Sequence, residues 1–153
     1  MRRVIFVLLM AASAFAAGPQ PSDSRGNPAA QDGWDRIKAA VENYLGRPYI
    51  WGACGLKSFD CSGFVWRVMA DNGLLIKRTT ARKLYMSLPR VPNRDRFAAG
   101  NIVFFDNLKH SGIIADSKTF YHAQSSVGTN LSTFDPYWRS KICGYRAMPK
   151  PNN

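Results

Sequence analysis

The first apolar pattern in the globular part of the chain has the period of an α-helix. It runs over residues 32–45, with an Asp at its start, and Gly46 follows directly. Its apolar positions at helical spacing are Trp34, Ile37, Val41 and Leu45. Because a helix-starting residue precedes this pattern and a glycine ends it, we predict a helix over residues 32–45.

A second helical pattern lies in the stretch FDCSGFVWRVMADNG, residues 59–73. Its predicted core-facing stripe consists of Phe64, Val65, Val68 and Met69. Asp60 is the predicted N-cap, so that Cys61 takes the first helical position. A third, shorter helix is predicted over residues 80–87, where two prolines follow.

The C-terminal half has the pattern of β-strands. NIVFFD (residues 101–106) is a continuous apolar run, HSGIIAD (110–116) and TFYHAQ (119–124) flank a turn at residues 116–118, and ICGYRAM (142–148) predicts a last strand. Since the helices precede an antiparallel sheet, this order predicts an α+β fold with the helices packed against one face of the sheet.

The first residues have the composition of an export signal. Arg2 and Arg3 precede an apolar run over residues 4–10 and then small residues, which predicts a signal peptide over residues 1–17. The apolar run is shorter than the roughly 20 residues that span a bilayer. We therefore expect an exported protein, periplasmic or secreted, without stable membrane insertion after cleavage. Residues 18–31 predict a flexible tether, and residues 32–150 a single domain.

The charge balance is strongly basic. The chain has 21 Lys and Arg against 10 acidic residues, and removal of Arg2 and Arg3 with the signal leaves 19 against 10, a formal charge of +9. Seven basic residues lie within residues 77–96, where Asp95 is the only acid: Lys77, Arg78, Arg82, Lys83, Arg90, Arg94 and Arg96. In an exported protein this favours an anionic envelope partner over nucleic acid, although a solvated basic face without a partner explains the same composition.

Cys61 is the candidate nucleophile of the chain. The N–H groups of a first helical turn have no partners within the helix, and the positive end of the helix dipole favours a thiolate. We therefore expect the pKa of Cys61 to lie below the free value of about 8.5, with Sγ facing outward. A cysteine nucleophile also needs a base, and the chain has only two histidines, His110 and His122.

The two histidines are predicted to share one face of a hairpin. Their midpoint is Asp116, inside the predicted turn, and cross-strand neighbours lie about 4.5 to 8 Å apart. This arrangement predicts a nucleophile, a base and a residue that orients the base, although spacing does not decide which histidine is which. A zinc site of Cys54, Cys61, His110 and His122 is disfavoured because C-x₆-C and H-x₁₁-H are not the usual ligand spacings. We expect no metal.

These residues resemble the successive blocks of the NlpC family of papain-like cell-wall peptidases. The blocks are GRPYIWGACGLKSFDCSGFVWRVM, KRTT, AAGNIVFFD, HSGIIAD and FYHAQSS, within residues 34–148. The resemblance implies a papain-like α+β core in which Cys61 is the nucleophile, His110 the base, His122 the third polar residue and Tyr49 a phenol near the oxyanion. It also implies a secreted cysteine endopeptidase that hydrolyses amide bonds in peptidoglycan stem peptides, commonly from γ-D-glutamyl to the diamino acid, without metal or organic cofactor.

Four positions depart from the family pattern. Asn101 follows Gly100 where Asp is usual, Lys83 stands where Gln is frequent, Ser111 where Val is common, and Cys54 where many relatives have Gly. None of them is a predicted catalytic position, but Lys83 is expected near the substrate groove and bears on substrate preference.

Two other functions are compatible with the same residues. One is an amidase or transpeptidase that acts on another envelope amide, and the other is a non-catalytic adaptor that binds an anionic polymer. We expect a monomer. We also expect Cys54 and Cys143 either to pair with each other or to stay reduced, with Cys61 free.

Overall fold

The structure, a computed structural model, describes residues 28–74 and 76–149. The predicted signal peptide and most of the predicted tether lie outside the described residues. The elements are α1 (Pro28–Glu42), α2 (Cys61–Asp71), α3 (Ala81–Ser87), η1 (Asn93–Asp95), β1 (Ile102–Phe105), β2 (His110–Ile114), β3 (Thr119–Gln124), β4 (Gly128–Thr133), α4 (Pro136–Lys141) and β5 (Ile142–Arg146). None of the helices in the described part of the chain has the length and apolar character needed to cross a bilayer.

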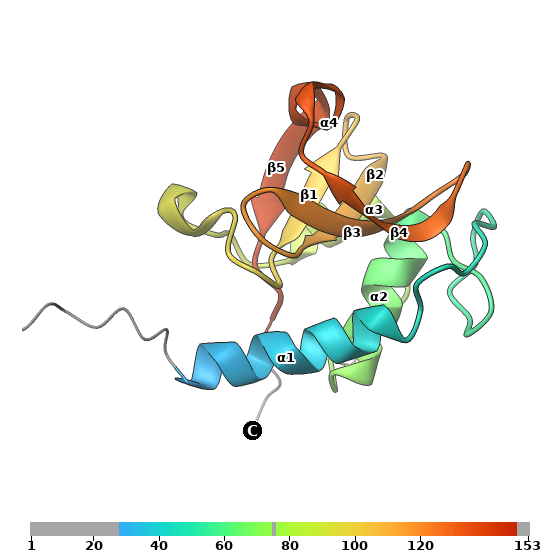
Figure 1. The fold of residues 1–153 in the computed structure, drawn as a ribbon, viewed down its shortest axis with the longest axis horizontal. Coiled ribbons are helices and arrows are strands. Elements are labelled where there is room, and N and C mark those ends of the chain that lie inside the picture. Colours follow the sequence, from blue (N-terminus) through green and yellow to red (C-terminus); the bar gives the residue numbers. More distant parts are fainter. Residues whose placement is uncertain (1–27, 75, 150–153) are drawn as a thin grey trace, which may run out of the picture.

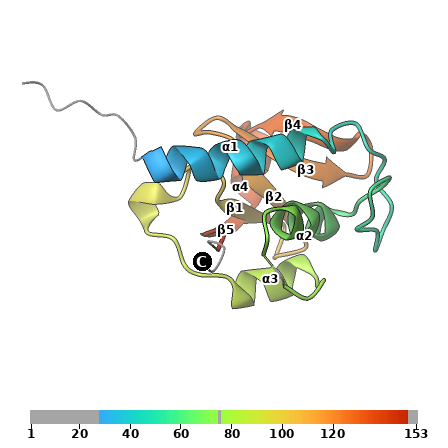
Figure 2. The same cartoon turned by 90° about the horizontal axis from the view of Figure 1, so that it is seen from below.

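The five strands form one antiparallel sheet in the order β4-β3-β2-β1-β5. Helices α1 and α2 lie on one side of this sheet, and α2 lies between α1 and α3 (Figures 1 and 2). The predicted α+β fold is confirmed. The three predicted helices pack on one face of the sheet, while the additional helix α4 lies on the other face (Figure 1).

Alternation along β1 divides the apolar residues into two clusters. Ile102 and Phe104 point to the cluster that α1, α2 and α3 cover, and the predicted stripe of α2 is fully buried there. Val103 and Phe105 point to the opposite cluster, which Trp138 of α4 helps to cover. Both faces of β1 are therefore buried, which explains why its sequence is a continuous apolar run.

Helix α1 differs from its prediction at both ends. It begins at Pro28, inside the predicted tether, where a proline without an N–H is tolerated. It ends at Glu42, so that Leu45 falls outside the helix and is 38% exposed. The chain turns away early because Gly46 N donates to Thr129 O at 2.8 Å, which ties the loop after α1 to β4.

Strand β4 and helix α4 were not predicted. The sequence GTNLST of β4 has no apolar alternation, and it becomes a strand because it pairs with β3 along its whole length. Helix α4 has six residues, and the Asp135 carboxylate caps it by accepting from Trp138 N at 2.9 Å. Strand β4 therefore depends on a contact that a local pattern does not contain, whereas α4 has a local cap but is too short to show an apolar period.

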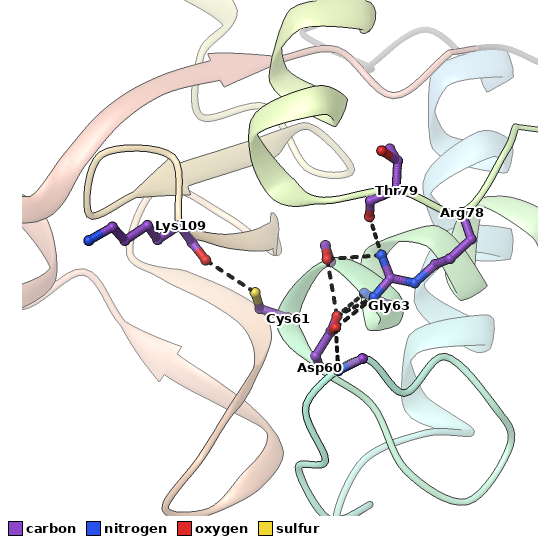
Figure 3. Close-up of polar contacts among 8 residues, drawn as sticks. Asp60, Cys61, Gly63, Arg78, Thr79 and Lys109 are labelled. Carbon is purple, nitrogen blue, oxygen red and sulfur yellow. Dashed lines mark hydrogen bonds and ion pairs between the residues drawn. The ribbon is translucent and has the colours of Figure 1, made fainter.

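The start of α2 is held by the carboxylate of Asp60. One oxygen accepts from Gly63 N at 2.6 Å and the other from Gly52 N at 2.9 Å, and Arg78 Nη2 contacts both oxygens at 2.7 and 2.6 Å (Figure 3). The predicted N-cap is confirmed. Arg78 therefore has a structural partner and does not belong to a solvated basic face.

A glycine at position 63 is required by the loop that precedes α2. A Cβ on Gly63 would lie 2.1 Å from the backbone oxygen of Ala53, which no packing adjustment of a side chain would relieve. The loop over residues 46–60 therefore lies directly against the first turn of α2. In the sequence Asp-Cys-Ser-Gly, the first residue caps the helix and the fourth admits the loop.

Replacement of Asp60 by Ala is expected to lower the free energy of unfolding by about 3 to 5 kcal/mol. The change removes a helix cap and leaves the guanidinium of Arg78, whose side chain is only 24% exposed, without its carboxylate. Thr80→Ala is the matched control, because Thr80 caps α3 from an exposed position and its loss should cost about 1 kcal/mol. Urea denaturation measures both values, and equal losses would contradict a central role for the pair of Asp60 and Arg78.

Candidate active site

Cys61 is the first residue of α2 and lies against the backbone at the start of β2 (Figure 3). Its Sγ donates a hydrogen bond to the carbonyl oxygen of Lys109 at 3.5 Å. The backbone N–H groups of Ser111, Ser62 and Cys61 itself face the sulfur. Since Lys109 and Ser111 flank His110 in the chain, the candidate nucleophile contacts the backbone that carries the candidate base.

The thiol of Cys61 is buried, which corrects the expectation of an outward-facing thiolate. Only 6% of the residue is exposed. Burial raises the pKa of the Cys61 thiol and the Asp60 carboxylate raises it further, while the backbone N–H groups around the sulfur lower it. Cys61 lies at the start of α2, as predicted. Desolvation of the thiolate nevertheless raises its pKa by more than the N-terminal end of the helix lowers it. Cys61 therefore rests as a neutral thiol.

His110 and His122 share one face of the sheet, as predicted, but they are diagonal neighbours. His122 pairs with Gly112 across β2 and β3, because hydrogen bonds between Ala115 and Thr119 centre the turn on residue 117 and not on 116. The Nε2 atom of His110 lies 2.8 Å from Nδ1 of His122, and the rings are nearly perpendicular at 85°. The diagonal register thus brings the two imidazoles into hydrogen-bond contact.

A chain of hydrogen bonds beyond His122 determines which ring nitrogen carries each proton. Asn130 Nδ2 donates to the carbonyl of Gly128 at 2.8 Å, so Asn130 Oδ1 faces Ser132 and accepts from its hydroxyl at 2.9 Å. With its proton used in that bond, the hydroxyl oxygen of Ser132 accepts from Nε2–H of His122 at 2.9 Å.

The same reasoning continues from His122 to His110. A proton on Nε2 of His122 leaves its Nδ1 as an acceptor, so Nε2–H of His110 donates to it. His110 then keeps an unprotonated Nδ1, which is the nitrogen able to accept a proton. Tautomers follow here from the hydrogen-bond directions, and they assign the basic nitrogen of the pair to His110.

Burial keeps both imidazoles neutral at neutral pH. Desolvation lowers the pKa of His110 to about 4, and Lys141 lowers it as well, against an opposite effect of Asp106. Desolvation and then the charge of His110 lower the pKa of His122 to about 3. Above about pH 5 the candidate base is therefore unprotonated and available to accept a proton from the neutral Cys61 thiol.

Aromatic side chains surround the imidazole pair. Trp138 of α4 stacks on His110 with ring centroids 5.4 Å apart and an interplanar angle of 27°, and it meets His122 edge-on at 4.9 Å. Phe105 and Phe120 contact His110 and His122, respectively, from β1 and β3. These rings cover His122 completely and His110 in part, and this desolvation is the main physical cause of the low imidazole pKa values.

Tyr49 lies in the loop before α2 and close to the nucleophile. Burial raises the pKa of its phenol, and the Cys61 thiolate, when it forms, and the Asp60 carboxylate raise it further. Two hydrogen bonds, both 3.1 Å long, hold the loop. Ile50 N donates to Phe59 O, and Phe59 N donates to Pro48 O. Tyr49 is thus near enough to Cys61 to interact with it electrostatically, and its place near the oxyanion stays a prediction.

The three cysteines are free thiols in the structure. Cys54 is half-buried beside Phe59, whereas Cys143 is exposed and its sulfur accepts from Asn107 N at 3.1 Å. Within residues 28–74 and 76–149, no three His, Cys, Asp or Glu side chains converge on a point that could hold a metal ion.

Three residues of the site were missed in the sequence. Asn130 and Ser132 alternate on β4, with Asn130 directly opposite His122, but the strand itself was not recognised. Had it been, the alternation Asn-x-Ser after a histidine strand would have placed both polar side chains on the face of His122. Trp138 lies in the six-residue helix α4, for which no periodic signal exists.

Comparison with known sequences gives one consistent family. The sequence profile of the NlpC/P60 family matches residues 46–147. The probable peptidoglycan endopeptidase LytE of Bacillus subtilis is 29% identical over 114 residues, which cover 71% of this chain and 33% of LytE. The probable endopeptidase NlpC homolog of Haemophilus influenzae is 29% identical over 107 residues, 68% of this chain and 57% of that protein. The chain thus spans about a third of the length of LytE and somewhat over half of the length of the NlpC homolog.

Comparison with solved structures establishes the fold. A protein of Staphylococcus aureus described as similar to a lipoprotein of the NLP/P60 family superposes with a TM-score of 0.68 at 24% identity, over 85% of this chain and 45% of that chain. The peptidoglycan hydrolase RipB of Mycobacterium tuberculosis superposes with a TM-score of 0.64 at 19% identity, over 86% of this chain and 71% of RipB. The expected papain-like α+β fold is confirmed.

The folded protein is expected to lose stability on acidification because of its two histidines. Unfolded histidine has a pKa of about 6.5, whereas burial holds the pKa of His110 at about 4 and that of His122 at about 3. Between about pH 6.5 and 4 the unfolded chain binds protons that the folded chain does not, so stability is full above this window and falls with pH inside it. The loss should reach a few kcal/mol, on the order of 1.4 kcal/mol per pH unit and histidine.

Chemical denaturation at pH 7.5, 6 and 5 measures this loss. Comparison of wild type with His122→Gln isolates the imidazole contribution, because the carboxylates are the same in both proteins. The variant should show a shallower fall than wild type, and identical pH dependence in the two proteins would refute the assignment of a buried, neutral His122.

Ser132→Ala is expected to change the imidazole tautomers without removing either histidine. In wild type, both rings should carry their proton on Nε2. Loss of a hydrogen bond worth about 1 kcal/mol should shift the tautomer ratio of His122 about fivefold. Ser132→Thr, which keeps the hydroxyl, is the control. ¹⁵N NMR of the imidazoles distinguishes the tautomers, and a spectrum unaltered by Ser132→Ala would show that β4 does not set them.

Proposed function

This chain belongs to the NlpC/P60 family, and from that premise we propose that it is an exported cysteine endopeptidase that hydrolyses amide bonds in peptidoglycan stem peptides. The observation that carries the proposal is that buried Cys61 bonds the Lys109 carbonyl next to His110, while half-buried His110 bonds buried His122 with defined imidazole tautomers. The probable activity named for LytE, a relative with which it shares most of its described domain, supports the same substrate.

In the first step, Nδ1 of His110 accepts the proton of the Cys61 thiol, and the resulting thiolate sulfur then attacks the amide carbonyl carbon. The carbon–sulfur bond forms as the carbonyl π electrons move to oxygen, which gives a tetrahedral oxyanion. Thiolate and imidazolium arise together, so each charge offsets the burial that disfavours the other alone. The imidazolium keeps its Nε2–H bond to His122, whose neutral Nδ1 stabilises the positive ring.

The oxyanion is stabilised at the start of α2. The backbone N–H of Cys61 belongs to the first helical turn and has no partner within the helix, and Tyr49 offers a phenolic O–H nearby. Donors of this kind contribute about 3 to 4 kcal/mol each in a site from which water is excluded. Collapse of the intermediate passes the Nδ1 proton of His110 to the leaving amine and leaves an acyl-enzyme on Cys61.

Water then completes the reaction by the same route. His110 takes a proton from water, the hydroxide adds to the thioester carbonyl, and the Cys61 thiolate leaves and regains its proton from His110. The products are a free carboxylate and a free amine. The bond that we propose for cleavage joins γ-D-glutamyl to the diamino acid of the stem peptide.

Substitution of the catalytic residues tests this proposal. Cys61→Ala and His110→Ala should abolish the release of new amino groups from peptidoglycan, with a loss of at least about a hundredfold for the base. His122→Gln should keep measurable activity, because a polar side chain can still orient His110. Cys143→Ala is the thiol control, since Cys143 is exposed on β5, and it should have wild-type activity.

Mass spectrometry of the released muropeptides identifies the cleaved bond. A new amino group on the diamino acid supports the γ-D-glutamyl assignment, while products in which the acyl group is joined to another amine would favour a transpeptidase. Unchanged cleavage by Cys61→Ala would place the chemistry elsewhere. Binding to peptidoglycan without any cleavage by the wild-type protein would favour the adaptor function.

A further inference from the structure

A cavity of about 370 Å³ lies along the outer strand β5, between this strand, α3 and the segment around η1. Its lining includes Arg90, Arg96 and Arg146 together with Tyr85 and Tyr145. None of the residues that line it belongs to the site of Cys61 and the histidines, and β1 separates β5 from β2 in the sheet. The proposed catalytic reaction makes no use of this cavity.

Arg146 is held in place before any ligand arrives. Its Nε donates to the carbonyl of Tyr85 at 2.7 Å and its Nη1 to the carbonyl of Tyr145 at 2.9 Å. The guanidinium also stacks over the Tyr85 ring, with its carbon 3.6 Å from the ring centroid. These partners are neutral, so they fix the position of the charge without neutralising it.

A glycine keeps the cavity wall close to Tyr85. A Cβ on Gly144 would lie 2.7 Å from the Tyr85 hydroxyl oxygen and 2.9 Å from a ring carbon, so the glycine lets the phenol approach β5 this closely. The Tyr85 ring in turn packs edge-on against Phe104 of β1, with centroids 5.1 Å apart. The aromatic floor of the cavity is therefore rigid, and it is built on the sheet.

The cavity has an excess of positive charge. No acidic residue is among those that line it. Asp95, the acid of the adjacent segment, is exposed and forms its ion pair with Arg94 at 3.5 Å. Arg90 and Arg96 are exposed at the cavity, and Arg96 lies over the Phe97 ring at 5.2 Å. Three arginines thus line a space that has no carboxylate among its lining residues in the described chain.

We propose that this cavity binds a carboxylate group of the peptidoglycan at a point away from the bond that is cut. The inference rests on the proposed function for the identity of the polymer. Planar guanidinium groups match the geometry of carboxylates, and a volume of 370 Å³ accommodates a whole amino-acid residue around that group. Attachment at a second point raises the effective concentration of the polymer at Cys61 and contributes to affinity.

The test removes charge at the rim of the cavity and leaves Arg146 in place, since Arg146 also supports the backbone. The full-length double variant Arg90→Gln/Arg96→Gln is compared with Arg94→Gln/Arg36→Gln, which loses the same charge from exposed residues that do not line the cavity. Both are made with Cys61→Ser, so that insoluble peptidoglycan is not degraded during co-sedimentation. The cavity variant should bind about tenfold or more weakly than its control, because it loses charge-assisted hydrogen bonds, which are stronger than neutral ones.

A second measurement separates this inference from the proposed catalysis. With Cys61 intact, the cavity variant should cleave a short soluble stem peptide at the wild-type rate, because that substrate does not reach β5. If the wild-type protein does not cleave the peptide, the catalytic proposal is refuted. If the cavity variant and its control bind equally to peptidoglycan in the co-sedimentation assay, the cavity proposal alone is refuted.

NMR titration of the full-length protein identifies the chemistry of the ligand. Glutarate, as the carboxylate probe, should shift the amide signals of Gly144 and Tyr145 in wild type, and these shifts should be lost in Arg90→Gln/Arg96→Gln. Inorganic phosphate is the comparison. Tighter binding of phosphate than of glutarate would overturn the carboxylate assignment in favour of a phosphate-bearing polymer, and no shift with either anion would overturn the site.

Discussion

The candidate site depends on the hydrogen bonds and the ion pair that the Asp60 carboxylate forms at the start of α2. The carboxylate caps α2 and accepts a hydrogen bond from Gly52 N in the preceding loop. Both of its oxygens also form an ion pair with Arg78. Arg78 in turn bonds Ser62 and the carbonyl of Thr79, so the segment that leads into α3 is tied to the same point (Figure 3). Three segments distant in sequence therefore converge where Cys61 begins its helix, and the thiol has little freedom to move.

Burial has opposite consequences for the structure and for the chemistry of this site. It makes every isolated charge unfavourable, which is why the thiol and both imidazoles rest neutral. The same burial makes a transfer of one proton from Cys61 to His110 a local event, because the two charges that result compensate each other. The polar chain through His122 to Ser132 then matters more than it would in water, since no solvent can replace its hydrogen bonds.

The basic residues of the chain have separate roles that composition does not reveal. Arg78 is a structural partner of Asp60, and Arg67 of α2 bonds Asp71 and the hydroxyl of Tyr44. Arg146 is fixed against Tyr85 beside an open cavity. The net charge is therefore not one uniform surface property, and the cavity on β5 is a place where arginines gather without a lining carboxylate.

The sequence by itself determined the elements whose signals are local. Asp60 and the apolar stripe of α2 specify a helix that begins at Cys61, and alternation places both histidines on one face of a hairpin. Tertiary structure decided what depends on contacts between distant segments. The thiol of Cys61 is buried because β2 packs over it, β4 is a strand because β3 pairs with it, and α4 covers the imidazoles from a sequence without periodicity. A pattern records the preferences of neighbouring residues, whereas desolvation and hydrogen-bond direction depend on which distant atoms come to surround a group.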